Sequence, residues 1–370
     1  MSPPAAPGFR SNYSRLDRLL HRLALQVAPV AEMSFDLDQA LRPKDDGRPE
    51  VARQRHVFVS GLARAGTTVL MRRFHETGAF RSLTYRDMPF VLAPNLWRRL
   101  STPSRREAVA AQRAHGDRLE VDFDSPESLD EVFWRIFCGD DYIRDDRLVP
   151  HTPDEESIAK FRRYVAAILS AERPEIRYLS KNNNNVLRLA GIREAFPEAL
   201  VLVPFRDPVR QAASLLDQHR RFRELQRADP FVLSYMSWLG HHEFGGDHRP
   251  FRFRDGDLDS LARRSPDTLD YWVANWIDTY GWLVETAPEA VVFVCYEDLC
   301  EDGRVWNALC DLAGLDRPAA AAPFRMAERP VPSACAAELE KAARHIYDRL
   351  RDRSLGRTPL RYRRPGFSAA

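Results

Sequence analysis

One short segment, His56–Phe74, constrains the fold of this chain more than any other. It reads HVFVSGLARAGTTVLMRRF, which predicts a strand at Val57–Val59, a tight turn, and a helix from Thr67 onward. The turn glycines, Gly61 and Gly66, adopt backbone angles that other residues resist, and they let backbone N–H groups approach an anion closely. The helix N-terminus adds unpaired N–H groups and the positive end of its dipole. The sequence therefore predicts a cradle for a phosphate or a sulfate group.

Strand-sized apolar runs and amphipathic helical segments alternate through the rest of the chain. That alternation favours a parallel α/β sheet. With the cradle, it predicts a P-loop-like three-layer α/β sandwich around a central, mainly parallel sheet. Strands are expected at Val57–Ser60, Arg177–Ser180, Leu200–Phe205 and Val291–Cys295. Helices are expected at Thr67–Thr77, Ser128–Phe137, Glu155–Ala171, Val186–Ala195, Pro208–Leu225, Thr268–Thr286, Val305–Ala313 and Ala334–Arg353.

The chain is predicted to hold one folded domain. No composition break marks a boundary after residue 53, so residues 54–370 are interpreted as a single unit. Residues 1–53 are expected to contain a disordered start, an amphipathic helix at Asn12–Gln26 and a charged linker at Pro43–Arg53. The longest apolar runs, such as Ala199–Phe205, are strand-sized, so no transmembrane segment is expected.

Composition narrows the functional classes. A chain of 370 residues with 44% hydrophobic and 29% charged residues has the composition of an ordinary globular protein. A net charge of +2 argues against a general nucleic-acid partner. The five cysteines are odd in number and form no C-x-x-C pair, which favours reduced thiols in a cytoplasmic setting.

The cradle departs from the nucleotide-binding pattern G-x-x-x-x-G-K-[ST] at a decisive position. Thr67 stands where a lysine would follow Gly66, and Arg64 supplies the cation from within the turn. Arg64-Ala65-Gly66-Thr67-Thr68 resembles the 5'-phosphosulfate loop of sulfotransferases that use 3'-phosphoadenosine 5'-phosphosulfate (PAPS), whose core reads R-S-G-T-T. Ala65 replaces the serine of that core and removes one hydroxyl. An ordinary strand-to-helix turn is the alternative interpretation of this motif alone.

A second informative segment, Leu200–Leu216, reads LVLVPFRDPVRQAASLL. Arg206 ends a predicted buried strand, Asp207 and Pro208 fit the first positions of a helix, and Ser214 lies two turns into that helix. The arginine and the serine can converge on one anion at the carboxyl edge of the sheet, where open α/β sheets bind ligands. The segment resembles the 3'-phosphate signature of the same family. A capped helix with a solvated arginine is the alternative.

A third segment, Tyr296-Glu297-Asp298-Leu299, resembles the Y-E-D-L motif of the family. The resemblance places Tyr296 beside the donor, whereas otherwise it is a tyrosine at a helix start. The three motifs span residues 56–300 and imply a sulfotransferase, of the branch that resembles tyrosylprotein and carbohydrate sulfotransferases. Such an enzyme moves a sulfuryl group from PAPS, its co-substrate, to an acceptor hydroxyl or amine without a metal ion. The donor-binding residues implied by the resemblance are Arg64, Ala65, Gly66, Thr67, Thr68, Arg206, Ser214 and Tyr296.

Sulfuryl transfer requires groups that stabilise the departing phosphate and a base that takes the acceptor proton. Arg64 is the natural stabiliser. Lys181, at the end of a predicted strand, matches a cation near the sulfuryl group in the same branch; a solvated lysine is the alternative. For the base, the resemblance points to Asp87, which would need a pKa raised by burial. His115 is the rival because its ordinary pKa suits the task, and Asp87 is alternatively a helix cap.

The acceptor is expected to be a small molecule or a carbohydrate. Aromatic and histidine side chains in and near a predicted lid, Phe231–Asp259, suggest a sugar: Trp238, His241, His242, Trp272 and Trp276. Two other functions stay open. A P-loop nucleotide kinase is disfavoured by the missing lysine and the missing magnesium ligands, and a non-catalytic module that only binds the nucleotide would have a similar sequence.

Overall fold

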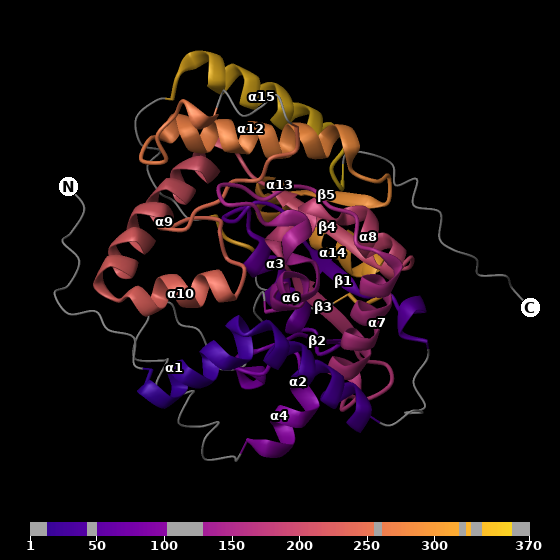
Figure 1. Cartoon of the computed structure of the whole chain (residues 1–370). Coiled ribbons are helices and arrows are strands. Elements are labelled where there is room, and N and C mark those ends of the chain that lie inside the picture. The colour runs from indigo at the N-terminus through magenta and orange to yellow at the C-terminus, as the bar shows by residue number, and fades with distance from the viewer. Residues whose placement is uncertain are drawn as a thin grey trace, which may run out of the picture.

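A five-stranded sheet lies at the centre of the molecule (Figure 1), in the order β2-β3-β1-β4-β5, and every neighbouring pair runs parallel. The structure is a computed structural model that describes residues 13–42, 50–101, 129–254, 261–317, 323–326 and 335–356. The predicted α/β class with a central parallel sheet is confirmed. The strands are β1 (Val57–Val59), β2 (Phe80–Arg81), β3 (Arg177–Lys181), β4 (Leu200–Phe205) and β5 (Val291–Cys295).

Helices surround this sheet and connect its strands. The longer described helices are α1 (Arg15–His21), α2 (Ala28–Leu41), α3 (Thr67–His75), α4 (Pro94–Leu100), α6 (Glu131–Tyr142), α7 (Glu155–Leu169), α8 (Leu189–Ala195), α9 (Pro208–Ala228), α10 (Pro230–Trp238), α12 (Leu269–Thr286), α13 (Tyr296–Glu301), α14 (Gly303–Ala313) and α15 (Ala337–Asp352). Short turns of other helix types are η1 (Arg22–Gln26), η2 (Val51–Arg53), η3 (Tyr85–Asp87) and η4 (Asn183–Leu187).

Alternation along the strands divides the core into two layers. In β4, Leu200 and Leu202 pack into a cluster with side chains of α3, α13 and α14. Val201 and Val203 face the opposite cluster, which draws on α6, α7, α8, α9, α12 and α15. Because successive side chains of a strand point to opposite faces, a strand that is buried throughout requires helices on both sides. The arrangement is a three-layer sandwich.

The residues before the sheet pack against this sandwich. The predicted amphipathic helix is divided into α1 and η1, and α2 follows after Val27. Phe35 of α2 is fully buried and packs against Phe137 of α6, with ring centroids 5.2 Å apart. The boundary at residue 53 stays a prediction. Within the described residues, no helix is both long enough and apolar enough to cross a membrane.

Two segments differ from the sequence-based expectations. Strand β2 was not anticipated, since two residues carry no periodic signal. The predicted lid, Phe231–Asp259, begins with a helix, because Asp229 caps α10 and Pro230 occupies its first turn. What remains of the described segment is a non-helical stretch, residues 239–254, which we call the 240s loop.

Candidate active site

The predicted cradle forms the connection between β1 and α3. Its backbone has positive φ at Gly61 (143°), Arg64 (69°) and Gly66 (90°), and Arg64 is the one non-glycine residue of the described chain with such an angle. A Cβ added at Gly66 would lie 2.3 Å from Cδ2 of Tyr296, so only glycine allows that ring to pack on the loop. The first motif and the Y-E-D-L motif thus meet at one point.

Buried side chains of α9 and α12 hold the cradle in place. Gln211 Nε2 donates to the carbonyl of Ala63 at 3.0 Å, and Trp276 Nε1 donates to Gln211 Oε1 at 3.0 Å. The Tyr280 hydroxyl donates to the carbonyl of Pro204 in β4 at 2.8 Å. Gln211, Trp276 and Tyr280 are almost completely inaccessible. The bond to Ala63 fixes the loop, and the bond to Pro204 fixes the neighbouring strand, so the cradle is held in one conformation.

A direct contact joins the first two sequence motifs. Arg64 Nε donates to Ser214 Oγ at 2.9 Å, across 150 residues of sequence. Arg64 is exposed, whereas Ala65 beside it is fully buried. The contact brings the cradle cation to the second turn of α9. The N-terminus of α3 and the Arg64 guanidinium together make the cradle electropositive.

Arg206 lies at the carboxyl end of β4 in a largely buried position. Its side chain is 13% exposed, with Nε 4.0 Å from Glu297 Oε1 and the guanidinium carbon 5.7 Å from the Tyr296 ring centre. That Nε is buried and has no hydrogen-bond partner among the described residues. A buried donor without a partner is costly, and an anionic ligand would satisfy it.

Glu297 stabilises the turn between β4 and α9, which contains Arg206 and Asp207. It accepts hydrogen bonds from the Asp207 backbone N–H at 3.0 Å and from the Tyr347 hydroxyl at 3.1 Å. Asp207 in turn caps α9 through the Arg210 N–H at 3.0 Å. Burial raises the pKa of Tyr296 to about 12, so its hydroxyl is neutral at physiological pH. In the Y-E-D-L motif, Tyr296 thus packs on the cradle, and Glu297 holds the turn that contains Arg206.

Lys181 ends β3, and its Cα is in register with Val59, the last residue before the cradle turn. Asn183, two residues after Lys181, donates from its Nδ2 to Glu243 of the 240s loop at 2.8 Å. Glu243 Oε2 also lies 3.6 Å from His241 Nδ1. Burial opposes ionisation of Glu243, but His241, Lys181 and Asn183 hold its pKa well below the ordinary value. The carboxylate is therefore charged, and it faces the end of β3.

The sequence model of the sulfotransferase family matches residues 56–319, more than half of the chain. The chain belongs to the sulfotransferase family. As a member it is a sulfotransferase, an enzyme that transfers sulfuryl groups.

Solved structures of other sulfotransferases are similar to this chain. Sulfotransferase STF1 from Mycobacterium tuberculosis is 16% identical, with a TM-score of 0.48 over 92% of this chain and 87% of that one. STF9 from Mycobacterium avium is 16% identical, with a TM-score of 0.47 over 91% and 78%. A sulfotransferase from Alicyclobacillus acidocaldarius is 14% identical, with a TM-score of 0.40 over 80% and 94%. No curated protein sequence matches the chain.

In this sulfotransferase, Asp87 is tightly bonded within its own segment. Arg81 Nη2 donates to both of its oxygens, at 2.7 and 2.9 Å, and the Thr84 backbone N–H donates at 2.8 Å. Asp87 is 6% exposed and completes the capping box of η3. The helix-cap alternative therefore describes its geometry, and its role as a base stays a prediction. His115, the rival, lies outside the described residues.

The sequence did not single out the carboxylate of the 240s loop. His241 was noted only as a sugar contact, and nothing in the spacing of residues indicates that Glu243 meets Asn183 from 60 positions away. The signal was weak: a carboxylate two residues after a histidine, in a loop rich in His and Gly. Of this pair, His241 is the more accessible, with 22% of its side chain exposed against 10% for Glu243.

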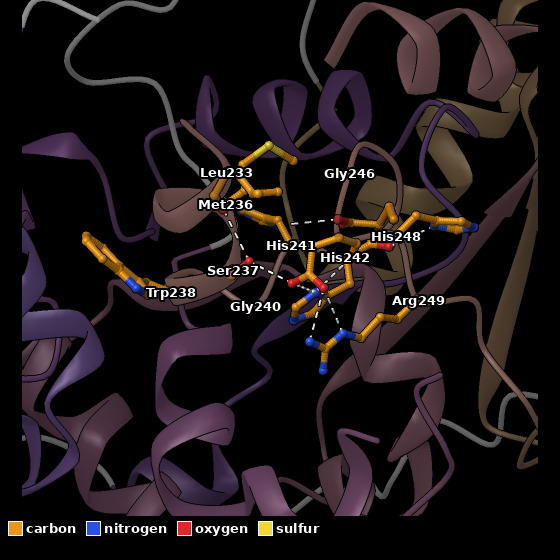
Figure 2. A network of polar contacts seen from close by, with 12 residues as sticks. Leu233, Met236, Ser237, Trp238, Gly240, His241, His242, Gly246, His248 and Arg249 are labelled. Atoms are coloured by element: carbon orange, nitrogen blue, oxygen red, sulfur yellow. Dashed lines mark hydrogen bonds and ion pairs between the residues drawn. The ribbon is translucent and has the colours of Figure 1, made fainter. Parts of the chain in front are cut away.

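One carboxylate organises the rest of the 240s loop (Figure 2). Asp247 accepts from Ser237 Oγ at 2.7 Å, from Arg249 Nη2 at 3.0 Å and from His242 Nδ1 at 3.1 Å. Burial opposes its ionisation, but these donors keep the pKa of Asp247 well below its usual value. These contacts hold the 240s loop in one conformation beside the carboxyl edge of the sheet. Among the described residues, no group of three or more His, Cys, Asp or Glu side chains could hold a metal ion.

Proposed function

We propose that this sulfotransferase moves the sulfuryl group of PAPS to an acceptor hydroxyl or amine by in-line transfer without a metal ion. The observation that carries the proposal is the contact between Arg64 and Ser214, at 2.9 Å. It joins a cradle suited to a 5'-phosphosulfate to Ser214 of α9, a residue of the segment suited to a 3'-phosphate. A donor with anionic groups on the 3' and 5' oxygens of one ribose needs two such sites close to each other.

Each predicted donor-binding residue has a role in this proposal. The amides of Gly66, Thr67 and Thr68 with the Arg64 guanidinium hold the 5'-phosphosulfate, and Ala65 contributes only its backbone. Arg206 and Ser214, both in the second motif, hold the 3'-phosphate. Two observations support the fit: the unsatisfied buried Nε of Arg206, and the close packing of Tyr296 on Gly66, which places the ring beside the cradle.

The proposed stabilisers of the departing phosphate are Arg64 and Lys181. Arg64 lies within the cradle turn. Lys181 ends β3, in register with Val59 of β1, the last residue before that turn. A lysine ammonium on a flexible stem can follow negative charge as it moves from the sulfuryl group to the leaving phosphate.

His115 stays a candidate for the base outside the described residues, and the structure describes two further candidates. Asp87 is the sequence-based candidate, although Arg81 and Thr84 already bond to its oxygens. The second candidate is His241, because histidine is the most common general base and its Nδ1 lies 3.6 Å from Oε2 of the ionised Glu243 carboxylate. Such a carboxylate would orient the imidazole and stabilise the imidazolium formed when the acceptor proton is taken. We propose to distinguish the two by mutation.

Further parts of the proposal concern the whole chain. We propose one catalytic domain over residues 54–370, and an acceptor that is a small molecule or a carbohydrate. A cytoplasmic location is proposed from the five cysteines, all of which carry free thiols. We propose no nucleic-acid partner, in keeping with the net charge of +2.

The test of this function is donor turnover. The protein is incubated with PAPS and a mixture of hydroxyl- and amine-bearing acceptors in excess EDTA, and adenosine 3',5'-bisphosphate is measured. Release that depends on acceptor supports sulfuryl transfer. A thermal-shift comparison of adenosine 3',5'-bisphosphate with ATP plus magnesium serves as the control. Stabilisation by ATP and magnesium alone would favour the kinase, and stabilisation by the bisphosphate without turnover would favour a binding module.

A further inference from the structure

The C-terminal helix α15 packs along α12 and also contacts α9 and β5 (Figure 1). Four side chains of one face are buried against the sandwich, and they fix the helix in place: Ala343, Ile346, Tyr347 and Leu350. The helix lies beyond residues 56–319, the part of the chain that matches the sulfotransferase family. Membership of that family therefore assigns α15 no role.

One edge of α15 contacts the second and the third sequence motif, which contain predicted donor-binding residues. Three of its side chains, spaced three and four residues apart, each donate a hydrogen bond to a carboxylate of these motifs: Arg344 to Asp207 at 3.1 Å, Tyr347 to Glu297 at 3.1 Å and Arg351 to Asp298 at 2.6 Å. Residues at this spacing lie on the same side of a helix. The helix therefore ties the two motifs together.

These contacts lie on both sides of Arg206 along the chain. The ring of Phe205, one residue before Arg206, packs edge-on against the ring of Tyr347, with centroids 5.6 Å apart. Asp207, one residue after Arg206, accepts from α15 through Oδ2 and caps α9 through Oδ1. The backbone N–H of Asp207 also donates to Glu297, which is the partner of Tyr347. The helix thus fixes the chain immediately before and after the arginine.

Tyr347 is the central residue of this contact. It is buried, and its ring centre lies 5.4 Å from the guanidinium carbon of Arg344 and 5.8 Å from that of Arg351. Burial raises the pKa of the Tyr347 hydroxyl well above its usual range, so the group is a hydrogen-bond donor at physiological pH. Its acceptor is Oε2 of Glu297, whose Oε1 accepts from the Asp207 N–H. Removal of the hydroxyl would therefore loosen the carboxylate that holds the turn.

The position of the Arg206 guanidinium matters because its Nε is buried and has no hydrogen-bond partner among the described residues. A hydrogen bond weakens steeply as its donor leaves the right distance and angle. The charge-assisted contact to a 3'-phosphate therefore depends on the backbone that carries the arginine. In this chain, contacts with α15 hold that backbone.

We propose that Arg344 and Tyr347 of α15 are positioning residues for the donor: they hold Arg206 where it meets the 3'-phosphate, and they act through Asp207 and Glu297 without touching the ligand. The inference rests on the proposed function, because it takes Arg206 to bind the 3'-phosphate of PAPS. It adds a requirement that lies outside the three motifs, namely that recognition of the 3'-phosphate depends on the C-terminal helix.

Affinities for adenosine 3',5'-bisphosphate and adenosine 5'-monophosphate test the positioning role, because only the bisphosphate carries the 3'-phosphate. Calorimetry on the full chain compares the parent with Tyr347→Phe, which removes one hydroxyl and no charge. The preference for the bisphosphate should fall about two- to tenfold, the worth of one hydrogen bond, while the affinity for the monophosphate stays nearly constant. Arg344→Gln should act in the same direction with a smaller effect, because its side chain is 46% exposed.

Two further variants serve as controls. Arg349→Gln removes a cation of α15 that is 42% exposed and pairs with Glu285 of α12 at 3.7 Å, so it should bind both nucleotides as the parent does. In an Arg206→Ala background, Tyr347→Phe should have no further effect on bisphosphate binding, because the residue that it positions is gone.

The outcomes separate this inference from the proposed function. Equal losses for the two nucleotides in Tyr347→Phe, equal effects of the Arg344 and Arg349 variants, or an undiminished effect of Tyr347→Phe in the Arg206→Ala background would each overturn the positioning role. If the parent prefers the bisphosphate and Tyr347→Phe keeps that preference, only the role of α15 is wrong. If the parent binds both nucleotides equally, the 3'-phosphate site of the proposed function fails, and the positioning role fails with it.

Discussion

Replacing Gly66 with alanine tests how the cradle and Tyr296 fit together. Two costs follow from the structure. An alanine at φ 90° occupies the left-handed region, which costs about 1–2 kcal/mol. Its Cβ would also lie 2.3 Å from Cδ2 and 2.5 Å from Cε2 of Tyr296, and overpacking of that kind costs about 1–3 kcal/mol. We expect Gly66→Ala to lower the free energy of unfolding by about 2–5 kcal/mol.

The chain provides a matched control for the backbone cost. Gly78 also has a positive φ, 72°, but nothing lies within 4 Å of an added Cβ. Gly78→Ala should therefore lower stability by about 1–2 kcal/mol at most, and the loss of unfolded-state entropy offsets part of this. Urea unfolding of both variants measures the difference, which reports the contact with Tyr296.

A double-mutant cycle isolates that contact. In a Tyr296→Ala background, the ring that the new Cβ would meet is gone, so Gly66→Ala should cost no more than Gly78→Ala does in the parent. Coupling of about 1–3 kcal/mol between positions 66 and 296 is expected. If the two glycine variants cost the same in the parent protein, or if the cycle shows no coupling, the packing of Tyr296 on the cradle is wrong.

Three further predictions concern chemistry and pH. If Asp87 is the base, Asp87→Asn should lower kcat about 10²–10⁴-fold with little change in donor affinity; a mild Asp87 variant beside a nearly inactive His241→Gln would assign the proton to the histidine. Turnover should persist in excess EDTA, and loss of activity that magnesium restores would contradict metal-free transfer. The free energy of unfolding should fall as the pH falls from about 6.5 towards 4. In the folded state His219 and His248 have pKa values of about 4 and stay neutral in this range, whereas in the unfolded chain both bind a proton, which favours unfolding. A combined His219→Gln and His248→Gln variant should flatten that dependence, and an unchanged slope would show that other groups cause it.

Local patterns predicted most of the sheet and the cradle. Strands β1, β4 and β5 are apolar runs bounded by turn signals, which are visible in the sequence alone. Strand β3 reads RYLSK and has only a short apolar centre. The cradle was predictable for the same reason, since its glycines, Arg64 and the helix start are consecutive. Strand β2 was not, because Phe80–Arg81 gains its conformation from pairing with β3.

The remaining geometry depends on tertiary packing. The contact of Arg64 with Ser214 joins residues 150 positions apart, and that of Asn183 with Glu243 joins residues 60 apart. Sequence reasoning grouped the first pair only through the family resemblance. For Asp87, the local pattern of a cap was correct, but the Arg81 pairing depends on the turn that follows β2.

The central claim is that two anion sites recognise the 3'- and 5'-phosphates of one bisphosphorylated adenosine. Calorimetric titration of adenosine 3',5'-bisphosphate and of adenosine 5'-monophosphate into the parent protein and into Arg206→Ala tests it most directly. The parent should bind the bisphosphate roughly ten- to more than a hundredfold tighter, because a charge-assisted contact to the 3'-phosphate contributes about 1.5–3 kcal/mol. That advantage should largely vanish in Arg206→Ala, while the affinity for the monophosphate stays nearly constant. Equal affinities for the two nucleotides in the parent, or an equal loss for both in the variant, would contradict the account.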